Sequence, residues 1–271
     1  MSDVALIDGI CDTHMHIYDD RYAVAASATL QPPDASPADY RRVQAQLGMQ
    51  RVVVVQPTTY GLDNSCTLDA VSEFGPTARA VVVVDDQLSR GRLDVLHDAG
   101  ARGARFHMLP GGAVACDQLA TVAALIADRG WHVQLQLNGH ELTDRFEALA
   151  ALPTPLVIDH VGRFMPPAEP DNDSFLALLR LVDTGRCWVK LSAPYESELD
   201  ALHRYPAVGR LARTLLQHAP ERMLWATNWP HPGQGDPPTA NDLARLRNEW
   251  LTHDTLRRQV LVDNPAELYG F

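Results

Sequence analysis

The stretch SPADYRRVQAQLGMQRVVVVQ, residues 36–56, contains the unit from which the fold is predicted. Its first part has the pattern of an amphipathic helix, with Ser36 and Pro37 as a start signal and Gly48 as a stop signal. Its second part, RVVVVQ at 51–56, is an apolar run typical of a strand that is buried on both faces. A helix is therefore expected to lead directly into a buried strand.

The same alternation of helical and strand-like segments continues along the chain. Further amphipathic helical patterns lie at 116–130, which ends on Gly130, and at 173–184. Eight runs are strand-like, at 5–14, 51–56, 79–84, 103–108, 132–137, 155–160, 187–192 and 223–228.

Eight strand–helix units in a chain of this length predict an α/β fold, a (β/α)8 TIM barrel formed as a single domain by residues 1–271. The competing fold is a doubly wound open sheet that binds a nucleotide. The chain lacks a Gly-x-Gly-x-x-Gly motif after the first predicted strand and lacks a Gly-Lys-Ser/Thr loop, which argues against that fold. Proline-rich pieces at 31–37, 166–170 and 230–238 fall in strand-to-helix loops, where a barrel builds its site.

The charge balance excludes some classes of partner. The chain has 34 acidic and 23 basic side chains, a formal net charge of -11 and a pI near 5.4. A nucleic-acid binder needs a basic face, so no nucleic-acid partner is expected. An anionic small molecule remains compatible with this charge, because a local group of arginines can sit inside an acidic protein.

Other sequence features bear on location. No apolar run approaches the ~20 residues of a membrane span, so no membrane partner is expected. The N-terminal MSDVALIDG lacks the basic and apolar regions of a secretory signal. The four cysteines form no Cys-x-x-Cys pair, which favours the reducing cytoplasm. The oligomeric state is not determined by the sequence.

Functional side chains of a barrel gather at the carboxyl ends of its strands. Polar residues follow every predicted strand of this chain at that end. They are Asp12, His14 and His16; Gln56; Asp85 and Asp86; Arg105 and His107; Gln136 and Asn138; Asp159, His160 and Arg163; Lys190, Ser192 and Tyr195; and Asn228 and His231.

His14 and His16 are two residues apart on a predicted strand, so both imidazoles point to the same face. Two imidazoles on one face can share a metal ion. A His-x-His pair also arises by chance, but its place at the end of the first barrel strand favours a functional role.

Three other residues are candidates for binding an anion or moving a proton. In IDHVGR at 158–163, His160 ends a strand and Arg163 follows, with a planar guanidinium suited to a carboxylate. His160 could instead only cap the strand end. Arg105 either faces the barrel interior, where it would need an anion, or points outward on the helix side.

In TNWPHP at 227–232, Asn228 and His231 lie where the eighth strand opens into a loop that could also merely close the barrel. Together with other segments, this motif resembles the amidohydrolase superfamily, in the branch that contains 2-pyrone-4,6-dicarboxylate lactonase and D-galactarolactone isomerase. The resemblance covers nearly the whole chain and implies a TIM barrel like that of the metal-dependent hydrolases. It rests on DTHMH (12–16), VVVQPTTYGLDN (53–64), GARFHMLPGGAV (103–114), IDHVGR (158–163), WVKLS (188–192), TNWPHP (227–232) and VDNPAELYGF (262–271).

The departures from the wider superfamily concern its metal. Metal-bearing members typically add a histidine on the fifth strand and an aspartate on the eighth, whereas this chain has Gln134, Gln136 and Asn228 there. A neutral amide is a poor ligand for Zn²⁺. The resemblance also implies that the lactone-processing branch works without a bound metal. No required cofactor is therefore expected, and adventitious zinc would be held by His14, His16 and His160.

The resulting hypothesis is a metal-independent enzyme that opens the ring ester of a carboxylated lactone. His14, His16 and His160 polarise the carbonyl and move protons, and Arg105 and Arg163 hold the carboxylate. Gln56, Tyr195 and Asn228 position substrate hydroxyls, and His231 is a further candidate base.

Hydrolysis is the expected reaction, because it is the commoner chemistry of the superfamily. Isomerisation is the alternative, because Asn228 cannot accept a proton as an aspartate would, and a lactone isomerase uses the substrate's own hydroxyl as nucleophile. Two other classes are weaker: a non-catalytic barrel that binds a carboxylate, and a metal-dependent decarboxylase or amidase of the same superfamily.

Overall fold

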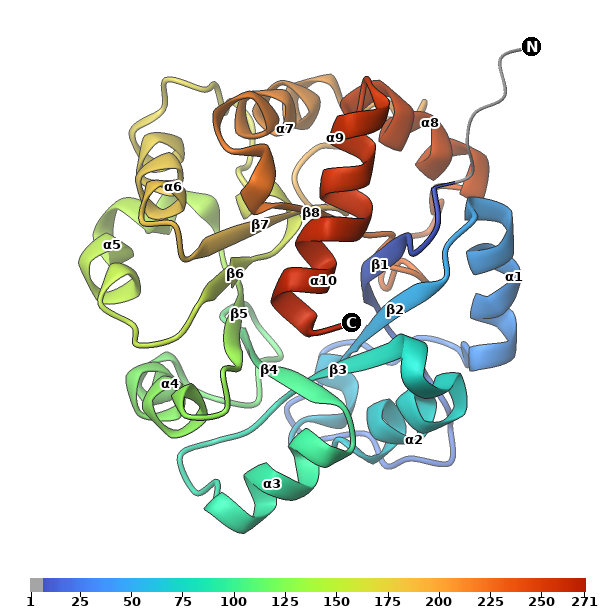
Figure 1. Cartoon of the computed structure of the whole chain (residues 1–271), viewed down its shortest axis with the longest axis vertical. Coiled ribbons are helices and arrows are strands. Elements are labelled where there is room, and N and C mark those ends of the chain that lie inside the picture. Colours follow the sequence, from blue (N-terminus) through green and yellow to red (C-terminus); the bar gives the residue numbers. More distant parts are fainter. Residues whose placement is uncertain (1–6) are drawn as a thin grey trace.

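The computed structural model describes residues 7–271 and shows eight strands surrounded by a ring of helices (Figure 1). The strands pair in chain order and every pair is parallel. The predicted (β/α)8 TIM barrel is confirmed. Its strands are β1 (Cys11–Met15), β2 (Arg51–Val55), β3 (Ala78–Val82), β4 (Ala101–His107), β5 (His132–Gln136), β6 (Leu156–Ile158), β7 (Cys187–Leu191) and β8 (Met223–Trp225).

One helix of the ring follows each strand, and two more helices end the chain. Within residues 7–271, no helix combines the length and the apolar character needed to cross a membrane. The helices are α1 (Pro37–Leu47), α2 (Ser65–Phe74), α3 (Arg90–Asp98), α4 (Leu119–Ala127), α5 (Leu142–Ala150), α6 (Asp173–Asp183), α7 (Pro206–His218), α8 (Ala240–Trp250), α9 (Asp254–Arg258) and α10 (Asn264–Tyr269).

The local signals read from the sequence act as expected at α1. Ser36 caps this helix by accepting a hydrogen bond from the Asp39 backbone N–H, and Asp39 accepts one from Ser36 in return. Gly48 ends α1 with φ 67°, a left-handed conformation that costs glycine little. In the predicted helix 116–130 the regular part ends earlier, at Ala127.

Several strands are shorter than predicted, and at β6 and β8 the backbone shows why. β6 ends at Ile158 and β8 at Trp225, because the chain leaves the extended conformation to place site residues. His160 and Asn228 have φ of 56° and 58°, which no strand accommodates. The first strand starts at Cys11 rather than at residue 5, and residues 1–6, which include the start of that prediction and most of the N-terminal MSDVALIDG, lie outside the described part of the chain.

The amino-terminal end of the barrel is closed by α10, which crosses the middle of the ring in Figure 1. Tyr269 of α10 is fully buried and packs with Cys11, Val53 and Leu224 inside the barrel. The opposite end, where the strands finish, is therefore the end that can be open to a substrate.

The seam between β1 and β8 depends on a buried carboxylate. Asp12 accepts hydrogen bonds from the Thr227 backbone N–H at 2.9 Å, from the Thr227 hydroxyl at 2.6 Å and from the Tyr40 hydroxyl at 3.0 Å. One residue after Thr227, the Asn228 backbone N–H donates to the His14 carbonyl at 2.8 Å. Asp12 thus joins the first strand, the last strand and α1 at the level where the site begins.

We predict that Asp12→Ala lowers the free energy of unfolding by about 3 kcal/mol, because it leaves buried donors of Thr227 and Tyr40 without an acceptor. Chemical denaturation of the purified variants measures this change. Asp20→Ala, at an exposed position, is the matched control and should stay within about 0.5 kcal/mol of wild type. Equal stability of the two variants would show that the seam does not depend on Asp12.

Candidate active site

A pocket of about 390 Å³ lies at the carboxyl ends of the strands. Most of its lining comes from strand ends that are far apart in the sequence, as expected for a TIM barrel. The lining residues are His16, Tyr18, Leu30, Pro57, Thr58, Arg105, His107, Gln136, His160, Glu196, Asn228 and Pro232.

The backbone is in the left-handed region at several of the predicted site residues. His160, Asn228 and His231 have φ of 56°, 58° and 65°. Non-glycine residues rarely adopt this conformation, and it concentrates at functional sites where surrounding contacts hold it in place. At Asn228 those contacts include the hydrogen bond from its N–H to the His14 carbonyl.

Arg105 faces the pocket from β4, which resolves the two orientations that the sequence left open. Its side chain is buried, and it donates to the Gln56 carbonyl at 2.8 Å and to Gln136 Oε1 at 2.7 Å. Its Nε has no hydrogen-bond partner, and no carboxylate of the described residues lies within 4.0 Å of the guanidinium. Burial lowers the pKa of Arg105, although arginine stays protonated. A buried positive charge without a counter-ion is a strong site for an anion.

His14 and His16 point to the same side of β1, as predicted. Their Nε2 atoms are 3.2 Å apart, and His16 Nδ1 lies 2.7 Å from the Val55 carbonyl oxygen. A carbonyl only accepts, so His16 carries its proton on Nδ1 and its Nε2 is an acceptor. Burial lowers the pKa of both, that of His16 to about 3, so the pair is neutral at pH 7.

Behind these histidines lies a fully buried group that contains Lys190, Gln134 and Asp159. Lys190 Nζ is 2.7 Å from Gln134 Oε1, 3.4 Å from His14 Nδ1 and 3.8 Å from Asp159 Oδ1. Gln134 Nε2 donates to Asp159 Oδ2 at 3.1 Å. Burial lowers the pKa of Lys190 to about 8, so this lysine is mainly an ammonium at neutral pH.

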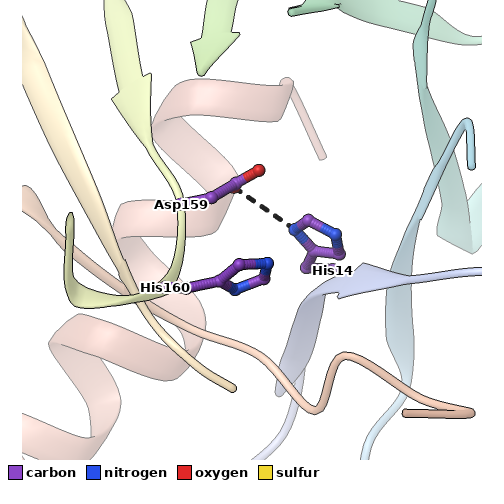
Figure 2. A group of neighbouring side chains, drawn as sticks. All are labelled: His14, Asp159 and His160. Atoms are coloured by element: carbon purple, nitrogen blue, oxygen red, sulfur yellow. Dashed lines mark ion pairs between the residues drawn. The ribbon is translucent and has the colours of Figure 1, made fainter. Parts of the chain in front are cut away.

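Figure 2 shows Asp159 and His160 reaching from the segment after β6 toward His14. One ligand atom from each of these residues lies within 4.8 Å of the others, so the three could hold a metal ion by type and spacing. The surroundings oppose this, because the Lys190 ammonium already lies beside both His14 and Asp159. Asn228 and Gln134 are neutral at the positions where further anionic ligands would be useful. This group of residues therefore does not fit a resident divalent cation.

His160 has the geometry of a residue that moves a proton. Its Nδ1 lies 2.9 Å from the Ser192 hydroxyl, and its ring lines the pocket. Because a hydroxyl can both donate and accept, Ser192 stabilises either neutral tautomer of the imidazole. The remaining nitrogen, Nε2, is the one left for a substrate. Burial holds the pKa of His160 well below its usual value, so the residue is an unprotonated base at neutral pH.

Asn228, Tyr195 and His231 form a chain of hydrogen bonds. Asn228 Nδ2 donates to the Tyr195 hydroxyl at 2.9 Å, and that hydroxyl lies 2.9 Å from His231 Nδ1. The tyrosine hydrogen is then donated to His231, whose pKa burial lowers to about 3. Only Asn228 of the three lines the pocket, and its buried Oδ1 has no hydrogen-bond partner among residues 7–271.

Besides Tyr195, two further predicted substrate-binding residues, Gln56 and Arg163, do not line the pocket. The Gln56 side chain is used by its own loop, with bonds to the carbonyls of Gly61 and Asp63 and from the Thr67 hydroxyl. Its contribution to the site is its backbone carbonyl, which holds Arg105. Arg163 donates from Nε to Glu196 at 3.3 Å, and it also hydrogen-bonds Asn138. Glu196, rather than Arg163, lines the pocket.

Several pocket residues were not singled out from the sequence. His107 and Gln136 stood among the strand-end polar residues, but nothing in their spacing separated them from their neighbours. Tyr18 and Glu196 lie as close to their strands as Tyr195 and Arg163, which were singled out, but nothing in their spacing marked them as pocket residues. Leu30 arrives from the long loop between β1 and α1, and no sequence signal placed it there.

Comparison with known proteins identifies the family of this chain. A sequence profile of the family described as Amidohydrolase matches residues 11–271. The chain belongs to the amidohydrolase family. The matched region contains every strand of the barrel and every residue that lines the pocket.

Individual members of this amidohydrolase family are similar over nearly the whole chain. D-galactarolactone isomerase of Agrobacterium fabrum is 36% identical over 266 residues, which cover 96% of this chain and 91% of that protein. The 2-pyrone-4,6-dicarboxylate hydrolase of Comamonas testosteroni is 32% identical over 274 residues, covering 96% and 90% of the two chains. An apo crystal structure from Agrobacterium tumefaciens superposes with a TM-score of 0.91 at 36% identity, covering 97% of this chain and 96% of that one.

We predict that His107 makes the stability of this amidohydrolase depend on pH. Burial lowers its pKa from 6.5 to about 4. Between these values the unfolded chain binds a proton at this residue and the folded chain does not, so the free energy of unfolding falls as the pH falls. The slope for one such histidine approaches about 1.4 kcal/mol per pH unit.

Denaturation of wild type and His107→Gln at pH 4.5 to 7 measures this slope, which we expect to be smaller in the variant. The control is Gln217→Ala, at an exposed position near the end of α7 that carries no titratable group, which should leave the slope unchanged. Equal slopes for wild type and His107→Gln would contradict a lowered pKa at His107.

Proposed function

We propose that the chain is a lactone-processing enzyme that transfers the acyl group of the ring ester of a carboxylated lactone without a resident metal. The observation that carries the proposal is the buried, unpaired guanidinium of Arg105 in a pocket that also contains His160 and Asn228. The relatives named for lactone reactions support the same class of substrate.

Arg105 is proposed to hold the substrate carboxylate. Only two of the five N–H donors of its guanidinium are used, by the carbonyl of Gln56 and by Gln136. A carboxylate would take the remaining donors and supply the missing negative charge. Since Arg105 is buried, this charge-assisted pair would orient the lactone ring strongly.

The proton chemistry is assigned to His160. The attacking oxygen forms a bond to the lactone carbonyl carbon and its proton passes to His160 Nε2. When the ring C–O bond breaks, the leaving alkoxide takes this proton back from Nε2. Nδ1 of His160 carries a hydrogen throughout this cycle and donates it to the Ser192 hydroxyl oxygen, which stabilises the imidazolium that forms. His14 and His16 keep the neighbouring wall of the site neutral and hydrogen-bonded.

The attacking oxygen separates the two possible reactions, since water gives hydrolysis and a substrate hydroxyl gives isomerisation. Asn228 favours the second, because its Oδ1 is buried without a donor and can accept from a hydroxyl of the substrate. Asn228 cannot take a proton from water. Hydrolysis remains the second candidate, with His160 as the base that activates water.

The decisive measurement follows galactaro-1,5-lactone and pyrone dicarboxylate by NMR and mass spectrometry with the metal-stripped protein in ¹⁸O-water. Isomerisation yields a new lactone without ¹⁸O, and hydrolysis yields an acid that carries one ¹⁸O. If the protein binds both compounds but converts neither, the enzyme proposal is wrong and the protein is a carboxylate-binding barrel. Loss of turnover on stripping, with recovery on adding Zn²⁺, would contradict the metal-independent mechanism.

We predict that His160→Ala lowers kcat by about 10²–10⁴-fold, the range typical of a lost acid–base group. The matched control is His218→Ala on the outside of the barrel, which should leave kcat unchanged. Turnover that survives in His160→Ala would move the proton chemistry to another histidine.

We predict that Arg105→Met lowers kcat/KM by about 10²–10³-fold, because a buried charge-assisted pair with the substrate is lost. Arg102→Met is the control, since Arg102 lies on the same strand and donates outside the pocket to the His97 carbonyl. A lactone that lacks the carboxylate should lose much less in Arg105→Met. An equal loss for both lactones would show that Arg105 does not bind the carboxylate.

A further inference from the structure

Lys190 is the only lysine in the 271 residues, and every other basic residue counted with it is an arginine. The chain buries this one lysine completely, in the centre of the barrel beneath the catalytic pocket. An arginine fork at this position would need more room and more acceptors than a compact ammonium. Burial of the single lysine at this position suggests that the Lys190 ammonium has a function of its own.

We infer that the Lys190 ammonium is the resident cation of this site, and that by directing the proton of His14 it prevents the site from binding a divalent metal. The inference deepens the proposed metal-independent function and rests on it for the identity of the site. It is carried by contacts of Lys190, His14 and His16.

The three hydrogens of the ammonium meet three acceptors. Lys190 Nζ donates to the Thr13 carbonyl at 2.7 Å and to Gln134 Oε1 at 2.7 Å. The third neighbour is His14 Nδ1, at 3.4 Å. Since the first two are acceptors only, the remaining hydrogen of the ammonium points to the imidazole. His14 Nδ1 is therefore an acceptor.

A second donor near His14 supports the same direction. Gln134 Nε2 also lies 3.4 Å from His14 Nδ1. Asp159 Oδ1 is 3.3 Å from the same nitrogen but forms no hydrogen bond with any described residue. With Nδ1 accepting, a neutral His14 must carry its proton on Nε2.

The proton on His14 Nε2 continues a one-way chain of hydrogen bonds. His14 Nε2 lies 3.2 Å from His16 Nε2, which is an acceptor because His16 donates from Nδ1 to the Val55 carbonyl. From Lys190 through His14 and His16 to the Val55 carbonyl, the hydrogen bonds thus all run in one direction. The two Nε2 atoms that could have shared a metal share a hydrogen instead.

This arrangement is the reverse of a metal site. A metal-bound histidine presents a lone pair to the ion, while its other nitrogen donates to a carboxylate or a carbonyl. Here the Lys190 ammonium donates to His14 Nδ1 at 3.4 Å, and Asp159 Oδ1 lies 3.3 Å from the same nitrogen without a hydrogen bond. The lone pair of His14 therefore faces Lys190, and its hydrogen faces His16. A dication would also lie close to the ammonium charge, with Asp159 as the nearest carboxylate to both.

The inference predicts that removing the ammonium creates a metal site. Metal-stripped wild type and Lys190→Met are titrated with Zn²⁺ against a chromophoric chelator. We expect wild type to bind no equivalent of Zn²⁺ tightly, and Lys190→Met to bind one equivalent at least 100-fold more tightly than wild type. Lys190→Met combined with His14→Ala should lose this gain, which shows that the new site uses His14.

A tautomer measurement on wild type keeps the inference testable if Lys190→Met does not fold. In ¹⁵N-histidine-labelled protein, His14→Ala identifies the His14 signals, and we expect their shifts to show a protonated Nε2. A protonated Nδ1, tight Zn²⁺ binding by wild type, or folded Lys190→Met without a gain in affinity would each overturn the inference. None of these readouts involves turnover, so failure of the lactone activity is a separate result.

Discussion

The site depends on the way the first and last strands of the barrel are joined. Asp12 accepts from Thr227 and Tyr40, and this buried carboxylate ties β1, β8 and α1 together. The same seam holds the Asn228 backbone against the His14 carbonyl. A residue that contacts no substrate therefore sets the distance between the histidines of β1 and the amide of β8.

The net charge of the chain does not describe the charges buried in its interior. The chain as a whole carries a formal charge of -11, yet two cations, Arg105 and Lys190, are buried at the active end of the barrel. Lys190 has Asp159 nearby, whereas Arg105 has no carboxylate within ion-pair distance among the described residues. Lys190 is hydrogen-bonded to protein acceptors, and Arg105 is the cation that we propose to bind the substrate.

Most of the barrel could be predicted from the repeated alternation of helical and strand-like segments. Each of the eight predicted strands is present. Short apolar runs between helical patterns are typical of parallel strands that are buried on both faces. The strand-end rule also located His14, His16, His160 and Asn228. It could not show that Gln56 and Arg163 would be occupied by protein partners, because those contacts come from loops distant in sequence.

The sequence by itself determined the barrel, the end that carries the chemistry, and the absence of the usual anionic ligand at position 228, since these follow from periodicity and residue identity. Only the tertiary structure decided which polar groups remain free. Arg105 is open to an anion and Arg163 is paired, although both are arginines that follow barrel strands. Hydrogen-bond partners depend on positions in space, and Lys190 meets His14 across 176 residues of chain.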